Sequence, residues 1–470
     1  MRLLVHGGTV VTSDETRRDD VLCEGGRIVA VGKIGDTAGV DEVLDADGLL
    51  VFPGFIDPHV HSRDPGATHK EDFAHSTLAA LCGGVTCVLE MPNAIPGVTD
   101  ADGFNERRRY LGERTWVDFG LWGLSLGAEN VDELEGMVRA GAVAIKMFWG
   151  YSLARDTKEL VYNPGDFPDR DVIPPFDTGD LYVTMREMVR LGAVLGLHCE
   201  DKAILDAALC ALGHPISTYQ DLLDARPSVA EAAAVATAAE VAGATGCRTH
   251  IVHLSSADGL RAVRAALVAG RPISAETCPH YLQLTGEDYD TVGPVMKVYP
   301  PVRDHADRTA LWEAIADGVI TSVGSDHGPH TMAEKLAGLA RAPAGVAGVE
   351  TLGVAIVDGM LEGLISPQTL AGVLSTNTAA IFGLYPRKGA IKPGADADLT
   401  LVDPSGTTTV TASDLHSISP TTMFDGRTFR GAIAASVLGG RVAMRYGQPV
   451  LERSGRFVSG KGSARHATGR

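Results

Sequence analysis

The middle of the chain, residues 53–386, alternates short apolar segments with longer amphipathic ones. The apolar segments predict eight strands, which read GFIDPHVH, TCVLEM, VDFGLWG, AVAIKMF, AVLGLHC, THIVHLS, ISAETCP and ITSVGSDH. Helical stretches rich in Ala, Leu and Glu, such as VAEAAAVATAAEVAGATG, separate them. This alternation predicts an α/β fold, a (β/α)8 TIM barrel, and it leaves an open doubly wound sheet as the alternative.

The two ends of the chain have a different pattern. Residues 1–52 alternate apolar and polar positions between Gly and Asp, which predicts short antiparallel strands with hairpin turns at Gly7-Gly8 and Gly25-Gly26. The same pattern returns over residues 387–451. We therefore expect a small β-sandwich-like domain built from both termini. Residues 452–470 are polar and rich in Gly and Ser, which predicts a flexible tail.

One segment fits neither pattern. Residues 151–180 are rich in Pro and Asp and follow no period, so we expect a long loop after the fourth strand. Loops of this length often have a function, for example as a lid over a site.

Composition and charge narrow the class of protein. Among 470 residues, 45% are hydrophobic and 21% are charged, which is typical of a globular protein. The net charge of −18 argues against nucleic acid or an anionic membrane as the main partner. Seven Cys without any C-x-x-C predict no disulfide framework. We see neither a signal peptide nor a membrane span, so we expect a cytoplasmic protein.

Polar side chains that can bind metal stand at the carboxyl ends of five predicted strands. They are His59, His61, Lys146, His198, His253 and Asp326. In a barrel these strand ends converge on one face. A single His at such a position is as well explained by a satisfied polar group, but the combination predicts a metal site. Imidazole and carboxylate ligands suit Zn²⁺, and Mn²⁺, Co²⁺ or Fe²⁺ also fit.

Lys146 needs a separate explanation, because an ammonium group has no lone pair for a metal. It either pairs with a carboxylate inside the barrel or reacts with CO₂ to form a carbamate that bridges two cations. A crowded cationic site lowers the pKa of a lysine and supplies the neutral amine for this reaction. Two bridged ions about 3.5–4 Å apart polarise a carbonyl and generate hydroxide.

The string GFIDPHVHSRDPG resembles the first-strand signature of the cyclic amidohydrolases, which include dihydroorotases, hydantoinases, dihydropyrimidinases and allantoinases. The resemblance continues through GGVTCVLEMPN, AIKMF, HCED, VHLSS, ETCPHYL, GSDHGPH and KGAIKPGADADLTLVD, and covers nearly the whole chain. It implies a metal-dependent hydrolase of a C–N bond in a five- or six-membered cyclic amide, and relatives of this kind are commonly dimers or tetramers.

The resemblance also implies roles for the candidate ligands. His59, His61 and Asp326 would hold one metal ion. His198 and His253 would hold the other, with the carbamylated lysine as the bridge. Asp326 would be the proton shuttle, first as base for the bridging hydroxide and then as acid for the departing ring nitrogen.

Three residues favour a dihydroorotase within this family. Arg63, Asn93 and His330 match the positions at which dihydroorotases bind the carboxylate of their substrate. A guanidinium fork with two neutral donors suits a carboxylate. The alternative is that Arg63 only pairs with Asp64 or Glu71.

Two tyrosines depart from the dihydroorotase pattern. Tyr299 stands in KVYPPVR, where dihydroorotases usually have asparagine, and it is a candidate substrate-binding residue. Tyr151 resembles the tyrosine with which hydantoinases and dihydropyrimidinases stabilise an oxyanion, although a packed loop aromatic explains it equally well.

The leading hypothesis is therefore a dihydroorotase-like enzyme that interconverts dihydroorotate and N-carbamoyl-aspartate through a metal-bridged hydroxide. The alternative is a hydantoinase, dihydropyrimidinase or allantoinase. A more remote one is a non-catalytic structural homologue, which predicts gaps among the metal ligands, and the sequence has none. We expect a small-molecule cyclic amide as partner and a homo-oligomer.

Overall fold

The barrel occupies the centre of the computed structural model, which describes residues 1–35, 39–162 and 169–460. Its eight strands are β8 (Phe55–Val60), β9 (Val85–Glu90), β10 (Asp118–Leu124), β11 (Ala144–Trp149), β15 (Leu195–Cys199), β16 (Thr249–Ile251), β17 (Ile273–Thr277) and β18 (Ser322–Val323). Neighbours in the chain are parallel neighbours in the sheet. A parallel bridge between Val60 and His327 joins the first strand to the segment after the last. This closure confirms the predicted TIM barrel and excludes the doubly wound sheet.

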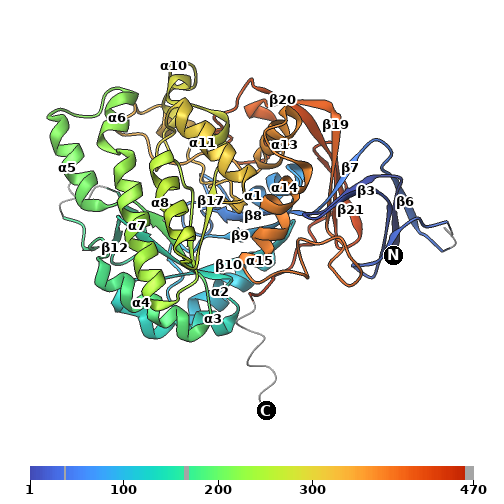
Figure 1. Cartoon of the computed structure of the whole chain (residues 1–470), viewed down its shortest axis with the longest axis horizontal. Coiled ribbons are helices and arrows are strands. Elements are labelled where there is room, and N and C mark those ends of the chain that lie inside the picture. Colours follow the sequence, from blue (N-terminus) through green and yellow to red (C-terminus); the bar gives the residue numbers. More distant parts are fainter. Residues whose placement is uncertain (36–38, 163–168, 461–470) are drawn as a thin grey trace, which may run out of the picture.

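Helices surround the strands in Figure 1. The longer ones are α1 (Phe73–Cys82), α2 (Ala101–Gly112), α3 (Leu134–Ala140), α4 (Thr178–Leu191), α5 (Lys202–Leu212), α6 (Tyr219–Ala225), α7 (Ser228–Thr245), α8 (Ala257–Val268), α11 (His305–Ala316) and α13 (Leu352–Glu362). Shorter ones are α9 (Pro279–Gln283), α10 (Tyr289–Val292), α12 (Met332–Lys335), α14 (Pro367–Ala371) and α15 (Asn377–Ile381). Because this cover buries nearly every strand residue, the strands are continuous apolar runs in the sequence.

Two further sheets are built from the ends of the chain, the first from its amino-terminal part alone and the second from both ends. The first contains β5 (Arg27–Gly32), β4 (Asp20–Glu24), β1 (Arg2–His6) and β6 (Glu42–Asp45) in that order. The second contains β22 (Gln448–Pro449), β21 (Arg441–Arg445), β20 (Thr428–Leu438), β19 (Leu399–Thr409), β7 (Leu50–Pro53), β2 (Thr9–Val11) and β3 (Thr16–Arg18). Apolar side chains of both sheets form one core, which confirms the predicted sandwich-like part, at the right of Figure 1.

One of the two predicted hairpins is wrong. Strands β4 and β5 do pair around Gly25-Gly26. By contrast, β1 and β2, on either side of Gly7-Gly8, lie in different sheets, and each also has a parallel neighbour. Gly7 has a φ of 74°, so the glycine pair does turn the chain. The turn leads the chain from the sheet that contains β1 to the sheet that contains β2. Each strand pairs where its apolar side chains are buried.

The segment over residues 151–180 contains more structure than a loop. Its described residues include β12 (Ser152–Ala154), β13 (Leu160–Val161) and β14 (Val172–Ile173), which form a sheet in the order β13-β12-β14. Residues 163–168 lie outside the described part. Strands of two or three residues are too short to show a period in the sequence, so the prediction of an irregular loop was wrong here.

The last described residues are docked on the barrel rather than loose. The Phe119 amide donates to the carbonyl of Arg456 at 3.0 Å, and the Val458 amide donates to the carbonyl of Phe119 at 2.7 Å. Val458 is fully buried. The predicted flexible tail is therefore wrong up to residue 460, and its remainder, residues 461–470, lies outside the described residues. The exact boundaries of the domains stay predictions.

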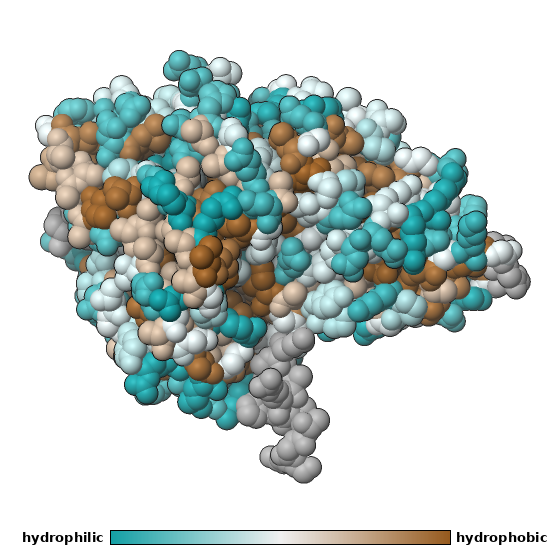
Figure 2. All heavy atoms as spheres, viewed as in Figure 1, coloured by the Kyte–Doolittle hydropathy of each residue, from teal (hydrophilic) through white to brown (hydrophobic). Residues whose placement is uncertain are grey.

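In the part of the chain that the structure describes, no helix combines the length and the apolar character needed to cross a bilayer. On the face shown in Figure 2, polar and apolar side chains are interspersed over both the barrel and the sheets.

Candidate active site

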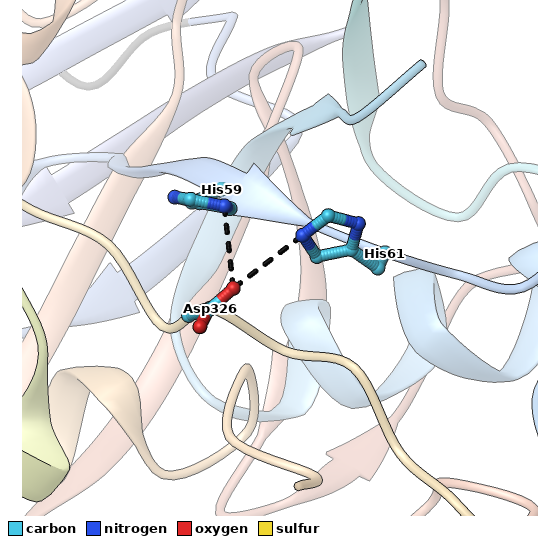
Figure 3. A group of neighbouring side chains, drawn as sticks. All are labelled: His59, His61 and Asp326. Atoms are coloured by element: carbon cyan, nitrogen blue, oxygen red, sulfur yellow. Dashed lines mark ion pairs between the residues drawn. The ribbon is translucent and has the colours of Figure 1, made fainter. Parts of the chain in front are cut away.

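Three predicted ligands meet at the carboxyl end of the barrel. His59 lies in β8, His61 directly follows it, and Asp326 follows β18. Oδ1 of Asp326 lies 3.2 Å from Nε2 of His59 and 3.4 Å from Nε2 of His61. Figure 3 shows the two imidazole rings turned toward the same carboxylate. Because their ligand atoms all lie within 4.8 Å of one another, the three side chains could hold one metal ion.

The second ring nitrogen of each imidazole, Nδ1, has its own hydrogen-bond partner. Nδ1 of His59 lies 2.6 Å from a carboxylate oxygen of Glu276, and Nδ1 of His61 lies 2.7 Å from Oδ1 of Asn93. Partners of this kind orient metal-binding histidines and leave Nε2 available as the ligand atom. Asn93, predicted to contact substrate, thus also holds a candidate ligand in place.

His198 and His253 form a second pair beside the first group. Nδ1 of His198 lies 2.8 Å from Nε2 of His253, and the centres of the rings of His59 and His253 are 5.5 Å apart. Nδ1 of His253 is buried and has no hydrogen-bond partner among the described residues. Burial lowers the pKa of both His198 and His253, which favours the neutral imidazole that a metal requires.

Lys146 is fully buried on β11, and its Nζ atom has no hydrogen-bond partner among the described residues. The simpler alternative, a barrel lysine paired with a carboxylate, is therefore wrong. Burial lowers the pKa of Lys146 to about 8, so the neutral amine is accessible near neutral pH. An amine that has no hydrogen-bond partner among the described residues, next to two groups of metal-binding side chains, is suited to form a carbamate.

Backbone strain is concentrated at this face. Outside glycine, the described residues have a positive φ at five positions, and three of these are Arg63 (60°), His253 (40°) and Asp326 (48°). A side chain other than glycine in this region costs about 1–3 kcal/mol, and such residues are typical of functional sites. Strain at His253 and Asp326 indicates that the surrounding structure holds these two candidate ligands in place.

The candidate ligands open onto a pocket. Nine of the predicted site residues line it, namely His59, His61, Arg63, Asn93, Tyr151, His198, His253, Tyr299 and Asp326. Phe148, Leu160 and Tyr162 add apolar and aromatic surface. Two predicted residues do not line it, since Lys146 is buried and His330 lines a neighbouring pocket that shares Arg63 and Asn93.

Arg63 borders the pocket but makes neither of the ion pairs considered for it. Its Nη2 donates to the carbonyl of Gly328 at 2.7 Å and its Nε donates to the carbonyl of Pro329 at 3.3 Å. Nε2 of His330 lies 3.1 Å from Nη2. The pairing with Asp64 or Glu71 is therefore wrong. His330 lies against the guanidinium, but its Nε2 is also 3.0 Å from the carbonyl of Ala344, the acceptor for an Nε2 proton.

Tyr151 is held in a buried polar network. Its hydroxyl donates to Glu200 at 3.0 Å and accepts from Nη2 of Arg226 at 2.7 Å. Arg226 also pairs with Glu200 and lies 3.7 Å from the centre of the Tyr299 ring. Burial raises the pKa of Tyr151 well above its usual value, so the phenol keeps its proton. Tyr151 is therefore not merely a packed loop aromatic.

Sequence reasoning missed three residues that support the site. Glu200 stands two positions after His198, and Glu276, the partner of His59, lies near the carboxyl end of β17, so both could have been found from the strand ends. Arg226 lies between two helices and follows no barrel strand, so nothing in the sequence points to it.

Comparison with known proteins identifies the class. The sequence pattern of the Amidohydrolase family matches residues 50–443. The chain therefore belongs to the amidohydrolase family, and it is an enzyme that hydrolyses a cyclic amide. All the candidate ligands are present, so nothing favours the non-catalytic homologue.

Particular relatives narrow the class further. The chain is 38% identical to an allantoinase of Rubrobacter xylanophilus, over 97% of both chains. It is 32% identical to an L-hydantoinase of Paenarthrobacter aurescens, over 97% of this chain and 98% of the relative. The solved L-hydantoinase (dihydropyrimidinase) from Arthrobacter aurescens superposes with a TM-score of 0.90 at 30% identity, covering 97% of this chain and 99% of that one.

These relatives correct the order of the hypotheses. They are named allantoinase and hydantoinase, and none of them is named a dihydroorotase. The alternative hypothesis thus fits better than the leading one. The trio of Arg63, Asn93 and His330 misled the prediction because Asn93 and His330 contact other site residues, which a short motif does not reveal.

Proposed function

We propose that this enzyme hydrolyses a hydantoin-type ring, a five-membered cyclic ureide. Allantoin is itself a hydantoin with a ureido group on C5, so the names of both kinds of relative share this ring. Water adds to the C4 carbonyl, the bond between N3 and C4 breaks, and N3 takes up a proton. The product carries a new carboxylate and a free carbamoyl nitrogen.

The observation that carries this proposal is the convergence of metal-binding side chains around an uncommitted lysine. His59, His61 and Asp326 would hold one divalent ion, and His198 and His253 would hold a second. Carbamylated Lys146 would be shared by both. The ligand set suits Zn²⁺, with Mn²⁺, Co²⁺ or Fe²⁺ as alternatives. Such a pair supplies Lewis-acid polarisation of the carbonyl and an activated water.

Asp326 moves the proton in this scheme. Burial raises the pKa of its carboxyl, but His59 and the other imidazoles outweigh burial and keep the pKa well below the usual value. The carboxylate is therefore ionised and lines the pocket. It accepts a proton from the attacking water and delivers it to N3 of the ring.

Tyr151 stabilises the charge that develops on the C4 oxygen. Tyr151 lines the pocket, Arg226 donates to its phenol oxygen, and Glu200 accepts its phenol proton. Rotation of that proton from Glu200 toward the substrate supplies a donor to the oxyanion, while Arg226 keeps the phenol in place.

Arg63 and Tyr299 are placed to contact the C5 substituent. The guanidinium borders both the main pocket and its neighbour, so a substituent that extends from the ring meets it. A ureido carbonyl accepts a hydrogen bond from such a group, and the Tyr299 ring supplies a flat apolar face.

A substrate panel at fixed metal loading tests the proposal. It contains allantoin, hydantoin, both enantiomers of a 5-substituted hydantoin, dihydrouracil and dihydroorotate. We expect kcat/KM for the best hydantoin to exceed that for dihydroorotate by at least about tenfold, which corresponds to about 1.4 kcal/mol. Faster turnover of dihydroorotate than of every hydantoin would contradict the proposal.

Arg63→Met separates substrate recognition from a structural role. Loss of a hydrogen bond from a charged group costs about 1.5–3 kcal/mol, so kcat/KM for allantoin should fall about 10- to 150-fold. Unsubstituted hydantoin, which has nothing at C5 to contact, is the control and should lose much less. Equal losses for both substrates would make Arg63 a structural residue.

A further inference from the structure

A second group of metal-binding and nucleophilic side chains lies away from the active site. Cys82 is the last residue of α1, and its Sγ atom lies 3.7 Å from Nε2 of His416. The opposite ring nitrogen, Nδ1, lies 2.8 Å from Oε1 of Glu350. The other oxygen of Glu350 accepts from the backbone amide of His416 at 2.8 Å. Thiol, imidazole and carboxylate thus follow one another in a line.

This group, named here the Cys82–His416 site, lies near the amino ends of the barrel strands. Cys82 directly precedes the turn into β9, whereas the active site lies where the strands end. All three residues line a separate cavity between the end of α1, the start of α13 and the sheet of β19 and β20. This cavity shares no lining residue with the active-site pocket. Cys82 is only 5% exposed, so a ligand would reach it from the cavity.

The backbone around the site fixes the spacing of its side chains. A Cβ atom on Gly83 would lie 2.4 Å from the carbonyl oxygen of Glu350, so the end of α1 approaches Glu350 as closely as only glycine permits. The hydroxyl of Ser436 on β20 donates to the carbonyl of Leu81 at 2.9 Å. Cys82 and Glu350 are therefore held relative to each other before any ligand arrives.

We propose that Cys82 and His416 bind one thiophilic divalent cation, such as Zn²⁺ or Co²⁺, with Glu350 as the residue that orients the imidazole. Zinc–sulfur and zinc–nitrogen bonds at a tetrahedral angle separate the two ligand atoms by about 3.6 Å. The observed separation of Sγ and Nε2 is 3.7 Å. A carboxylate on the second ring nitrogen is the usual partner of a metal-bound histidine. Water would complete the coordination.

Binding exchanges a proton for the metal. The thiol S–H bond breaks, sulfur donates its electron pair to the cation, and the proton leaves to solvent. Burial raises the pKa of the Cys82 thiol, so without a cation the group stays protonated. The cation, which deprotonates a coordinating thiol outright, would overcome this. The site does not depend on the proposed substrate, because it shares no residue with the active site.

A cobalt titration tests the proposal. Enzyme already loaded with Co²⁺ at its active site is titrated with further Co²⁺, and absorbance from thiolate-to-cobalt charge transfer is followed in the near ultraviolet. The proposed active-site ligands include no thiolate, so they do not contribute to this signal. We expect one further equivalent of Co²⁺ to bind, with the signal rising in step.

Variants decide whether these residues are responsible. Cys82→Ser should abolish the signal, whereas Cys210→Ser, at an exposed cysteine, should leave it unchanged. His416→Gln, at a half-buried position, should abolish saturable binding. Glu350→Gln should weaken binding about 10- to 100-fold. Hydantoin turnover should be the same in Cys82→Ser and wild type.

Two results would overturn the proposal. One is a charge-transfer signal that persists in Cys82→Ser. The other is the absence of any additional equivalent of Co²⁺ in wild type, which would leave the contact as a plain hydrogen bond between thiol and imidazole.

Discussion

Two buried lysines of the barrel have opposite surroundings. Lys388 lies beside the first residue of β10, where its Nζ atom forms ion pairs with Asp118, Asp396 and Asp398. Lys146 is the third of the six residues of β11 and has no hydrogen-bond partner among the described residues. Their side chains are both almost completely inaccessible to solvent.

The difference shows that partners, rather than burial, decide what a buried lysine can do. At Lys388 burial opposes the charged form, but the neighbouring carboxylates outweigh it and raise the pKa above its usual value. At Lys146 burial dominates and lowers the pKa to about 8. Lys388 is therefore a permanently charged structural group, whereas Lys146 has a neutral amine available for reaction with CO₂.

The largest effect should come from Lys146→Ala. We expect loss of both metal ions and of more than the 10- to 100-fold in activity that follows removal of a mere supporting partner of a metal ligand. Elemental analysis and turnover, measured on protein purified without chelators, check this, with about two equivalents of metal expected in wild type. Partial rescue by small carboxylic acids would support the carbamate. Full metal loading in the variant would break the comparison.

Asp326→Asn should rank next. The amide keeps the shape of the side chain but cannot accept the proton, so kcat should fall about 10²- to 10⁴-fold while the protein stays folded. Metal content and circular dichroism are measured on the same sample. A variant with full metal content and more than about a tenth of the activity would assign the proton transfer to another group.

Lys388→Met tests how much the ion pairs of this lysine contribute to stability. Removing one partner of a buried ion pair typically costs about 3–5 kcal/mol, because the remaining charges lose their compensation. We expect this loss in the free energy of unfolding, measured by denaturant on metal-free protein. Lys146→Met, the matched control, leaves no hydrogen-bonded partner behind and should cost much less. Similar losses in both variants would mean that burial, and not the ion pairs, sets the contribution of each lysine to the free energy of unfolding.

The smallest effect concerns acid stability. Burial raises the pKa of Asp396, but Lys388 and Arg387 outweigh burial and hold it below the usual value. A depressed pKa adds stability above the usual carboxyl pKa of about 4, and this stability is lost as the pH falls through the lower folded value. Between pH 6 and pH 3, wild type should lose more unfolding free energy than Asp396→Asn. Parallel curves would contradict the assignment.

The barrel and its candidate ligands could be predicted because both are local signals. Each strand is an apolar run. His59, His198 and Asp326 stand near or just beyond the carboxyl end of such a run, and Lys146 is the one charged residue within β11. The topology then brings them together without further information. The same argument would have found Glu200 and Glu276.

The rest depends on contacts that no local pattern encodes. Arg226 reaches Tyr151 across 75 positions of the chain, and Cys82 reaches His416 across 334. The three strands of residues 152–173 are too short to show a period, and the partners of β1 and β2 are set by burial in two separate sheets. Substrate class was misjudged for the same reason, since Asn93 and His330 contact other site residues.

We infer that Lys146, and not Lys388, carries a carbamate. This is tested by ¹³C nuclear magnetic resonance of the metal-loaded enzyme equilibrated with ¹³C-labelled bicarbonate. We expect one carbamate carbon per chain, present in wild type and in Lys388→Met and absent in Lys146→Ala. A fully active wild-type enzyme with two metal ions and no carbamate resonance, or a resonance that survives in Lys146→Ala, would contradict it.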